Sequence, residues 1–516
     1  MIKATEALSS VEPPAGQRWW LEPSVWIMLF LGFSAGIPIL LIFSSLSLWL
    51  AEAGVSRSAV TFFSWAALGY SFKFVWAPLV DRLPIPVLSR LLGRRRSWLL
   101  LSQFSIIASI LLMANTDPQD SLTAVAIAAV LLGFSSATQD VVIDAFRIES
   151  AEPRLQAMLS STYVAGYRTA MIVAGAGAIY LAQYFGSTTD HYSYDAWRLA
   201  YSCMAGAMLI GVATTFSISE PMQSRDRAYS AATSDYAKFF LVFCASILGF
   251  VAVFLITPDA PKWFDGGVQG VFGFTYGSGV LAIALAAAFF VAKASLRLNL
   301  VDRDMVNQGY VEPIQDFFAR YGKLAIWVLL LVGFYRVSDI VMGVITNVFY
   351  HDLGYSKAEI ASVTKVFGVV MTITGSFLGG ILALRYGVMR ILMLGAVLVA
   401  FTNLAFVWLA YQQPLIEYLA GVIVIDNLSQ GIAIAAFIAW LSSLTNVSFT
   451  ATQYAIFSSV MTLFPKLIAG FSGTLVDVMG YPNFFLLASA MGIPVIVLIY
   501  VLKDKLKLST ENAPSV

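Results

Sequence analysis

Long apolar stretches bounded by glycine, proline or charged clusters recur along the whole chain. A helix needs about 20 apolar residues to cross a bilayer, so each stretch predicts one membrane span. The stretches fall into groups of six, two and six, at residues 25–51, 58–80, 97–114, 121–147, 156–185 and 196–218, then 238–257 and 268–293, then 324–350, 358–384, 390–411, 415–445, 453–478 and 482–502. This pattern predicts an all-α polytopic membrane protein with 14 spans.

The composition points the same way. Of the 516 residues, 59% are hydrophobic and only 12% are charged, whereas soluble domains carry about 25% charged residues, which disfavours a cytosolic enzyme. The net charge of +1 gives no general attraction to nucleic acid. Cys203 and Cys244 lie in apolar runs, and His191 and His351 have no other ligands beside them, so we predict neither a metal site nor a cofactor.

The two groups of six resemble each other. Ala53-Gly-Val-Ser-Arg57 and Leu353-Gly-Tyr-Ser-Lys357 open matching runs, and Gln156, Ser160, Ser161, Arg168 and Gly175 align with Gln453, Ser458, Ser459, Lys466 and Gly473. Small residues recur in any membrane bundle, but the charged positions also match, which favours a repeat of two six-helix bundles. We therefore expect an N-terminal segment at 1–24, a bundle at 25–220, a linker with two extra spans at 221–323, a second bundle at 324–503 and a tail at 504–516.

Basic residues between the runs are concentrated on one side. If the N-terminus is inside, the outer segments hold only Arg57, Arg198, Lys262 and Lys357, and the inner segments hold most of the others. Positively charged loops stay in the cytoplasm, so both termini are predicted to be cytoplasmic.

Nine charged residues lie inside the apolar runs. Five are basic and four are acidic: Lys73, Arg168, Arg336, Lys365, Lys466, Asp140, Asp144, Asp339 and Asp426. Each costs about 2.5–3.5 kcal/mol at the centre of the bilayer, so we expect these charges to face one another or a water-filled cavity. They predict a polar interior shared by the two bundles.

Asp140 and Asp144 are four residues apart and therefore lie on one helical face. Two buried carboxylates on one face allow one of them to bind and release a proton near neutral pH, so they are candidates for proton coupling. Asp140 is the first candidate, followed by Asp339 and Asp426. Asp144 has an alternative role, because it could belong to a gating ion-pair network with Arg147 and Glu149.

The buried cations suit an anionic substrate. Lys73, Arg168 and Lys365 have no acidic partner nearby in the sequence, so each finds a partner across the bundle or binds an anionic ligand. Arg336 can bind substrate or simply pair with Asp339. The substrate-binding residues are thus predicted to be Lys73, Arg168, Arg336 and Lys365, with Gln139 and Gln453 as hydrogen-bonding partners of sugar or amide groups.

The loop after the second run carries the residues of a gate. Its Asp81, Arg82, Gly93, Arg94, Arg95 and Arg96 can bond helix ends and a facing carboxylate in one conformation only. The loop resembles the signature Gly-x-x-x-Asp-Arg-x-Gly-Arg-Arg of the major facilitator superfamily, with Ala77 in place of the first glycine. In the second copy, Gly380-Ile-Leu-Ala-Leu-Arg-Tyr-Gly-Val-Met-Arg390, Leu384 stands where the aspartate would be.

A narrower resemblance covers nearly the whole chain. The segments that carry it are Gly32-Phe-Ser-Ala-Gly-Ile-Pro38, Phe72-Lys-Phe-Val-Trp-Ala-Pro-Leu-Val-Asp-Arg82, Gly93-Arg-Arg-Arg-Ser-Trp-Leu-Leu100, Ser136-Ala-Thr-Gln-Asp-Val-Val-Ile-Asp-Ala145, Gly166-Tyr-Arg168 and Ala451-Thr-Gln-Tyr-Ala455. Together they resemble the muropeptide permease (AmpG) family. Asp426-Asn-Leu stands where that family often has Glu-Asn-Leu.

The resemblance implies a bacterial inner-membrane carrier. It would import anionic anhydromuropeptides, which are cell-wall sugar peptides, by proton symport with alternating access. A related carrier for acetyl-coenzyme A or a siderophore-like metabolite is the nearest alternative. A membrane enzyme acting on lipid-linked sugars is a further one, although the longest polar connections lack a catalytic group.

Overall fold

The computed structural model describes residues 22–55, 68–188, 191–221, 233–258, 261, 263 and 266–511, and the named elements among them are all helices. We call residues 22–221 and 325–503 the N-terminal and C-terminal halves. The N-terminal half contains α2 (Pro23–Ile42), α3 (Ser44–Glu52), α5 (Leu68–Phe72), η3 (Lys73–Val75), α6 (Ala77–Arg82), α7 (Leu88–Leu92), α8 (Arg94–Ala114), α9 (Leu122–Ser150), η4 (Pro153–Leu155), α10 (Gln156–Ile172), η5 (Val173–Gly177), α11 (Ala178–Tyr184), α12 (Tyr194–Ala207) and α13 (Leu209–Ser217).

The remaining helices form the linker and the second bundle. The linker contains α15 (Thr233–Ile256), α16 (Gly266–Arg297), α17 (Arg303–Val306), η6 (Asn307–Val311), α18 (Glu312–Tyr321) and η7 (Gly322–Leu324). The C-terminal half contains α19 (Ala325–Phe334), α20 (Val337–Asp352), α21 (Lys357–Ile360), η8 (Ala361–Phe367), α22 (Gly368–Tyr386), α23 (Val388–Leu409), α24 (Ile416–Ser443), η9 (Val447–Phe449), α25 (Thr450–Ala469), α26 (Ser472–Ala490) and α27 (Gly492–Glu511).

Within the described residues, twelve helical stretches are long and apolar enough to cross a membrane. They coincide with twelve of the predicted runs, so the all-α polytopic class is confirmed. The run 58–80 lies partly outside the described residues and is otherwise broken into α5, η3 and α6. The run 453–478 is not among the twelve, because α25 is rich in serine and threonine and contains Pro465 and Lys466. The count of 14 spans stays a prediction.

Each half has its own apolar core, and close helix crossings depend on small residues. On α10, a Cβ atom added to Gly166 would lie 1.9 Å from the carbonyl oxygen of Leu29 on α2. On α22, a Cβ added to Gly375 would lie 2.1 Å from the carbonyl oxygen of Leu428 on α24. Only glycine lets the two backbones approach this closely, as is common between membrane helices.

The two extra helices of the linker lie at the periphery. Only 11% and 17% of the most apolar windows of α15 and α16 are buried, against 33–72% for the other candidate spans. Phe239 of α15 joins an apolar cluster with Phe72 and Trp76 of the N-terminal half. The extra pair thus covers the outside of the N-terminal half and leaves the contact between the halves to other helices.

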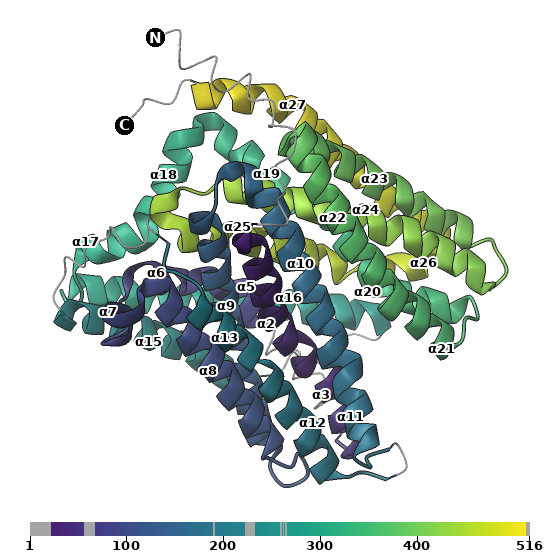
Figure 1. Ribbon diagram of the computed structural model, residues 1–516, viewed down its shortest axis with the longest axis horizontal. Coiled ribbons are helices and arrows are strands. Elements are labelled where there is room, and N and C mark those ends of the chain that lie inside the picture. Colours follow the sequence, from purple (N-terminus) through teal and green to yellow (C-terminus); the bar gives the residue numbers. More distant parts are fainter. Residues whose placement is uncertain are drawn as a thin grey trace.

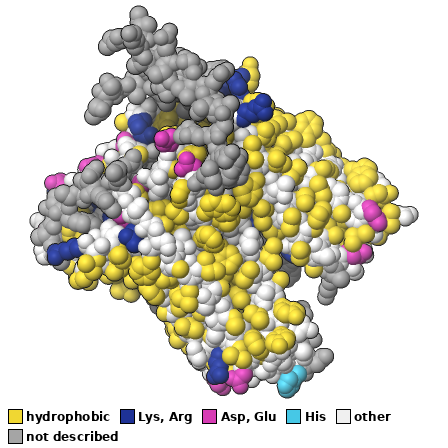
Figure 2. Space-filling view, in the orientation of Figure 1, with side chains coloured by type: hydrophobic (Ala, Val, Ile, Leu, Met, Phe, Trp, Pro, Cys, Tyr) yellow, Lys and Arg dark blue, Asp and Glu magenta, His cyan; other side chains and the backbone are white. Residues whose placement is uncertain are grey.

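The halves meet at one end of the molecule and diverge at the other (Figure 1). α10 packs against α22 and α24, and α25 packs against α5, η3, α6 and α9. We call the end where α6 meets the start of α25 the closed end. At the opposite end, the tips of α12 and α21 lie far apart in Figure 1. Hydrophobic side chains cover the middle of the face in Figure 2, as expected for a surface in contact with lipid.

Candidate functional site

A buried charge cluster joins three segments of the N-terminal half. Asp144 and Arg147 lie three positions apart on α9 and share one helical face, and the short turn η3 brings Lys73 toward them. Lys73 Nζ is 3.6 Å from Asp144 Oδ2, and Arg147 Nη2 is 3.1 Å from Asp144 Oδ1. All three side chains are buried. A lone charge at this depth is costly, so the pairing explains how the span tolerates these residues.

Arg147 also reaches the C-terminal half. Its Nη1 donates to Ser160 Oγ on α10 and to Ser442 Oγ on α24, both at 2.9 Å. Its guanidinium lies 5.3 Å from the ring centre of Tyr454 on α25. Asp144 therefore pairs with two cations of its own half, and Arg147 connects this network to the other half through an uncharged serine and an aromatic ring. We call Lys73, Asp144, Arg147, Ser442 and Tyr454 the Arg147 cluster.

Asp140 lies one turn before Asp144 on the same face of α9 and has fewer partners. It is 7% exposed and is within electrostatic range of Lys73 and Asp144. Tyr163 on α10 is within electrostatic range of it, while its Oδ1 has no hydrogen-bond partner in the described part of the chain. A carboxylate with one free oxygen beside a hydroxyl can accept a proton without breaking an ion pair.

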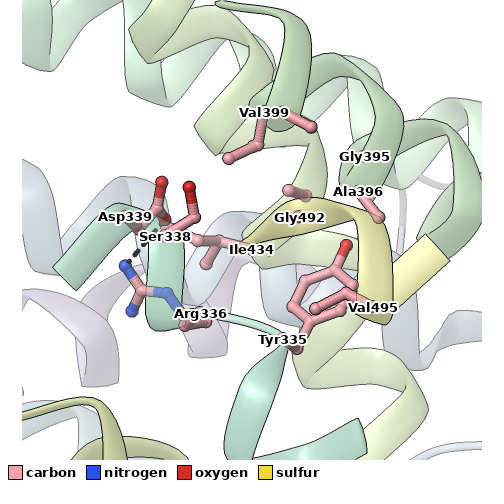
Figure 3. A pocket seen from close by; sticks show the side chains of 12 residues that line it. Tyr335, Arg336, Ser338, Asp339, Gly395, Ala396, Val399, Ile434, Gly492 and Val495 are labelled. Carbon is pink, nitrogen blue, oxygen red and sulfur yellow. Dashed lines mark hydrogen bonds and ion pairs between the residues drawn. The ribbon is translucent and has the colours of Figure 1, made fainter. Parts of the chain in front are cut away.

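A second charged group lies where α19 meets α20 and is drawn in Figure 3. Arg336 Nη2 is 3.3 Å from Asp339 Oδ2, and the two side chains point toward each other beside Ser338 and Ile434. The cavity that they line measures about 10 Å³, which is about the space that one water molecule needs.

Arg168 brings a further cation to this group from the N-terminal half. It is carried by α10 and is within electrostatic range of both Arg336 and Asp339. Arg168 and Arg336 are both partly accessible. Two guanidinium groups from opposite halves therefore lie within electrostatic range of the Asp339 carboxylate, an arrangement that favours an anionic group between them.

Other predicted residues are buried within one half. Asp426 on α24 accepts a hydrogen bond of 2.8 Å from Gln430 Nε2 and is within electrostatic range of Asp339. Gln139 on α9 accepts a hydrogen bond of 3.3 Å from Ser34 Oγ on α2 and is fully buried. Both side chains are therefore tied to their own bundle in this conformation.

Lys365, Lys466 and Gln453 lie in three different surroundings. Lys365 on η8 is exposed, and Lys466 Nζ donates to Ser71 Oγ across the halves at 3.2 Å. The Gln453 amide donates to Asp316 Oδ2 of α18 at 2.8 Å and accepts from Arg320 Nη2 at 3.0 Å. The structure thus places Gln453 in a network with the linker and not in the Arg147 cluster.

The predicted gating residues meet at the closed end. The Asp81 carboxylate accepts hydrogen bonds from Arg95 Nη2 at 2.8 Å and from Thr452 N and Oγ1 at 2.8 and 2.7 Å. The amide of Ala451 donates to it as well, at 3.2 Å. Since Ala451 and Thr452 lie in the first turn of α25, a carboxylate of one half holds the N-terminus of a helix of the other half.

The neighbouring arginines connect other helix ends. Arg95 forms a second ion pair, with Glu149 Oε1 at 2.6 Å. Arg94 Nη1 donates to the Asp81 carbonyl oxygen at 2.5 Å. Arg96 bonds to two carbonyl oxygens in the last turn of α13 at 3.2 and 3.1 Å. Arg82 donates to the Gln308 side chain and carbonyl in the linker at 3.3 and 3.1 Å.

Sequence reasoning missed Glu220, which follows α13. Its Oε1 and Oε2 accept from the amides of Arg95 and Arg96 at 2.8 and 3.1 Å, so it satisfies the first turn of α8. Gly93 has φ +90°, and a Cβ there would lie 2.5 Å from the Glu220 side chain, which explains the glycine. Ser442 and Thr452 were also missed, because a serine or threonine in an apolar run signals close packing as readily as a contact between halves.

The comparisons with known proteins agree with this architecture. The family model described as Major Facilitator Superfamily matches residues 28–334 and 326–515, so the chain belongs to that superfamily. It is therefore a secondary transporter rather than an enzyme. The chain superposes on the proton:xylose symporter XylE bound to 6-bromo-6-deoxy-D-glucose with a TM-score of 0.61 and 13% identity, over 92% of this chain and 94% of that one.

Within the superfamily, the chain is similar to particular transporters over almost its full length. It is 29% identical over 481 residues to the "Putative transporter AmpG 4" of Rickettsia conorii, covering 93% of this chain and 97% of that one. It is 26% identical over 496 residues to the "Anhydromuropeptide permease" of Escherichia coli K12, covering 96% and 83%. The resemblance noted in the sequence is thus confirmed.

Proposed function

We propose that the protein imports anionic anhydromuropeptides across the bacterial inner membrane by alternating access. The observation that carries the proposal is that Arg168 and Arg336, from opposite halves, lie within electrostatic range of each other, and that Arg336 is 3.3 Å from Asp339. A substrate carboxylate held between the two guanidinium groups would contact both halves at once, as a site at the interface of two repeats requires. The names of similar transporters supply the substrate class.

The substrate-binding residues of this proposal are the cations and the amides predicted from sequence. Lys73, Arg168, Arg336 and Lys365 neutralise the carboxylates of the peptide stem, and Arg is suited to bidentate contact with them. Gln139 and Gln453 are hydrogen-bonded within the protein, as Lys73 and Arg336 are ion-paired, so each would exchange a partner before it contacts substrate. The amides carry no charge and are therefore secondary to the four cations in this proposal.

Proton symport drives accumulation in this proposal, and Asp140 carries the proton. Its unpartnered Oδ1 leaves it free to be protonated, whereas Asp144 already neutralises two cations. Asp339 and Asp426 are the coupling residues of second rank. With a proton on Asp140, Lys73 is attracted only to Asp144, so protonation changes the pairing inside the N-terminal half.

Uptake of labelled anhydromuropeptide into proteoliposomes tests the proposal. A proton gradient should drive accumulation above the external concentration, and an ionophore that collapses the gradient should reduce it to equilibration. Excess acetyl-coenzyme A or a siderophore should not compete, and competition by either would assign the site to that class of cargo. Gradient-independent accumulation would contradict proton coupling.

The Asp140→Asn variant tests the residue. We expect substrate binding to be retained and accumulation to be lost, because the amide cannot exchange a proton. Asp235→Asn is the matched control, since Asp235 is a surface residue paired with Lys238 at 3.3 Å. Unchanged accumulation in Asp140→Asn would exclude this residue as the coupling acid.

A further inference from the structure

A groove of about 1030 Å³ opens on the outer surface of the C-terminal half, between the start of α23 and the end of α27. We call it the α23–α27 groove. Its walls include the apolar side chains of Met389, Met393, Ile496 and Val497. The walls belong to the candidate spans Val388–Leu409 and Ser472–Lys503, and Val497 is 54% exposed. The groove therefore opens toward the hydrocarbon region of the membrane and not toward the contact between the halves.

Two cations stand at the polar end of this apolar groove. Arg390 is exposed, and no hydrogen bond or ion pair engages it in the described part of the chain. The Nζ of Lys503 lies 4.0 Å from the ring centre of Tyr500, whose own ring lines the groove. Basic and tyrosine side chains at the end of a membrane helix sit at the level of the lipid headgroups.

The backbone adds to the positive field at this point. Helix α23 begins at Val388, directly after Gly387, which has φ +87° and provides no side-chain cap. The first backbone N–H groups of α23 thus have no acceptor within the helix and no side-chain cap, and Arg390 lies in the same first turn. Two cations and a helix N-terminus therefore lie together at one end of the apolar groove.

We propose that the α23–α27 groove binds one anionic phospholipid of the surrounding membrane. Arg390 and Lys503 hold the phosphate, and an acyl chain lies along the walls formed by Met389, Met393, Ile496 and Val497. A phospholipid is the occupant that fits both parts, because it joins an acidic headgroup to a hydrocarbon tail at the required depth, and basic pockets between membrane helices recognise such headgroups. The site lies apart from the transport residues.

Lipid titration into the delipidated full-length protein tests the proposal, with bound lipid counted by native mass spectrometry. We expect one phosphatidylglycerol per chain to bind well above the level of phosphatidylcholine. Removing both cations in Arg390→Ala/Lys503→Ala should weaken phosphatidylglycerol binding about thirtyfold, from about 1 kcal/mol per basic residue at an anionic surface. Binding of phosphatidylcholine should not change.

The matched control is Lys293→Ala/Arg297→Ala on α16. It removes the same charge from exposed positions, and Lys293 likewise lies over an aromatic ring, 5.8 Å from the centre of Phe289. This control should bind phosphatidylglycerol as the unaltered protein does. A second variant, Met393→Trp, fills the groove without changing charge and should reduce the binding of phosphatidylglycerol.

Three results would overturn the proposal. The first is an equal loss of phosphatidylglycerol binding in the α16 control, which would show that binding depends on the net charge of the protein and not on this groove. The second is equal affinity for the two lipids. The third is a dimer that disappears on Met393→Trp substitution, which would assign the groove to a second copy of the chain. Transport is not measured, so the result is independent of the proposed function.

Discussion

Replacing Asp81 by asparagine should open the closed end. Asp81 is 2% exposed and its carboxylate accepts three hydrogen bonds from Ala451 and Thr452 in the other half. Asparagine keeps the shape and one acceptor oxygen but loses the charge and the second acceptor. Losing at least one charge-assisted hydrogen bond costs about 2 kcal/mol, which shifts the equilibrium between closed and open conformations about thirtyfold toward open.

A buried reporter between the halves measures this shift. Ala157 on α10 is 1% exposed and packs in an apolar cluster with residues of the C-terminal half. In a background with Cys203→Ser and Cys244→Ser, Ala157→Cys should react slowly with a maleimide, because only the open conformation exposes it. Adding Asp81→Asn should raise the alkylation rate by about thirtyfold, since the rate follows the open population.

The matched control is Glu220→Gln. Glu220 also holds the first turn of a helix through its carboxylate, but its hydrogen bonds to the amides of Arg95 and Arg96 lie within the N-terminal half. The control should lower thermal stability without changing the alkylation rate. If Asp81→Asn and Glu220→Gln gave the same rate, the carboxylate of Asp81 would not hold the halves together.

Two further predictions test other contacts. Ser442→Ala removes the hydrogen bond from Arg147 to the other half and should raise the alkylation rate of the same reporter about tenfold, from about 1.5 kcal/mol for a bond to a charged donor. Ser160→Ala removes the equivalent bond within the N-terminal half and should leave the alkylation rate unchanged. Equal alkylation rates in the Ser442→Ala and Ser160→Ala variants would refute the role of Ser442 in holding the halves together. Gly166→Ala should lower the melting temperature in detergent, because the new methyl group overlaps the backbone of α2 at a cost of about 1–3 kcal/mol. Gly206→Ala, where a Cβ meets nothing within 4 Å, should leave the melting temperature unchanged or raise it. A lower melting temperature for Gly206→Ala than for Gly166→Ala would contradict the close packing of α10 against α2.

Hydrophobic periodicity predicted the fold class because membrane helices satisfy their own backbone and need only length and apolarity. It could not predict the break at Lys73, where a 3₁₀ turn separates α5 from α6 and brings this residue to Asp144. Nor could it place the extra pair α15 and α16, since a hydrophobic run does not say which neighbour it packs against.

The candidate site was only partly predictable for a related reason. Spacing along one helix put Asp140 and Asp144 on one face, and the charges inside apolar runs identified the residues to examine. Their partners come from far away in the sequence: Arg147 and Ser442 are 295 positions apart, and Asp81 and Thr452 are 371 apart. Neither Ser442 nor Thr452 has a charge that marks it as a partner, so only the tertiary structure reveals them.

The chemistry of these distant partners has a consequence for the transport cycle. Asp81 is bound to Arg95 within its own half and to uncharged donors of α25 in the other half. Arg147 likewise pairs with Asp144 in its own half and donates to an uncharged serine across the interface. Removing one partner of a buried ion pair costs about 3–5 kcal/mol, whereas losing a hydrogen bond between a charged group and a neutral one, which water can replace, costs about 1.5–2 kcal/mol. In both contacts the halves can therefore separate without leaving a charge unpaired, which keeps the closed and open conformations close enough in energy for both to be populated during a cycle.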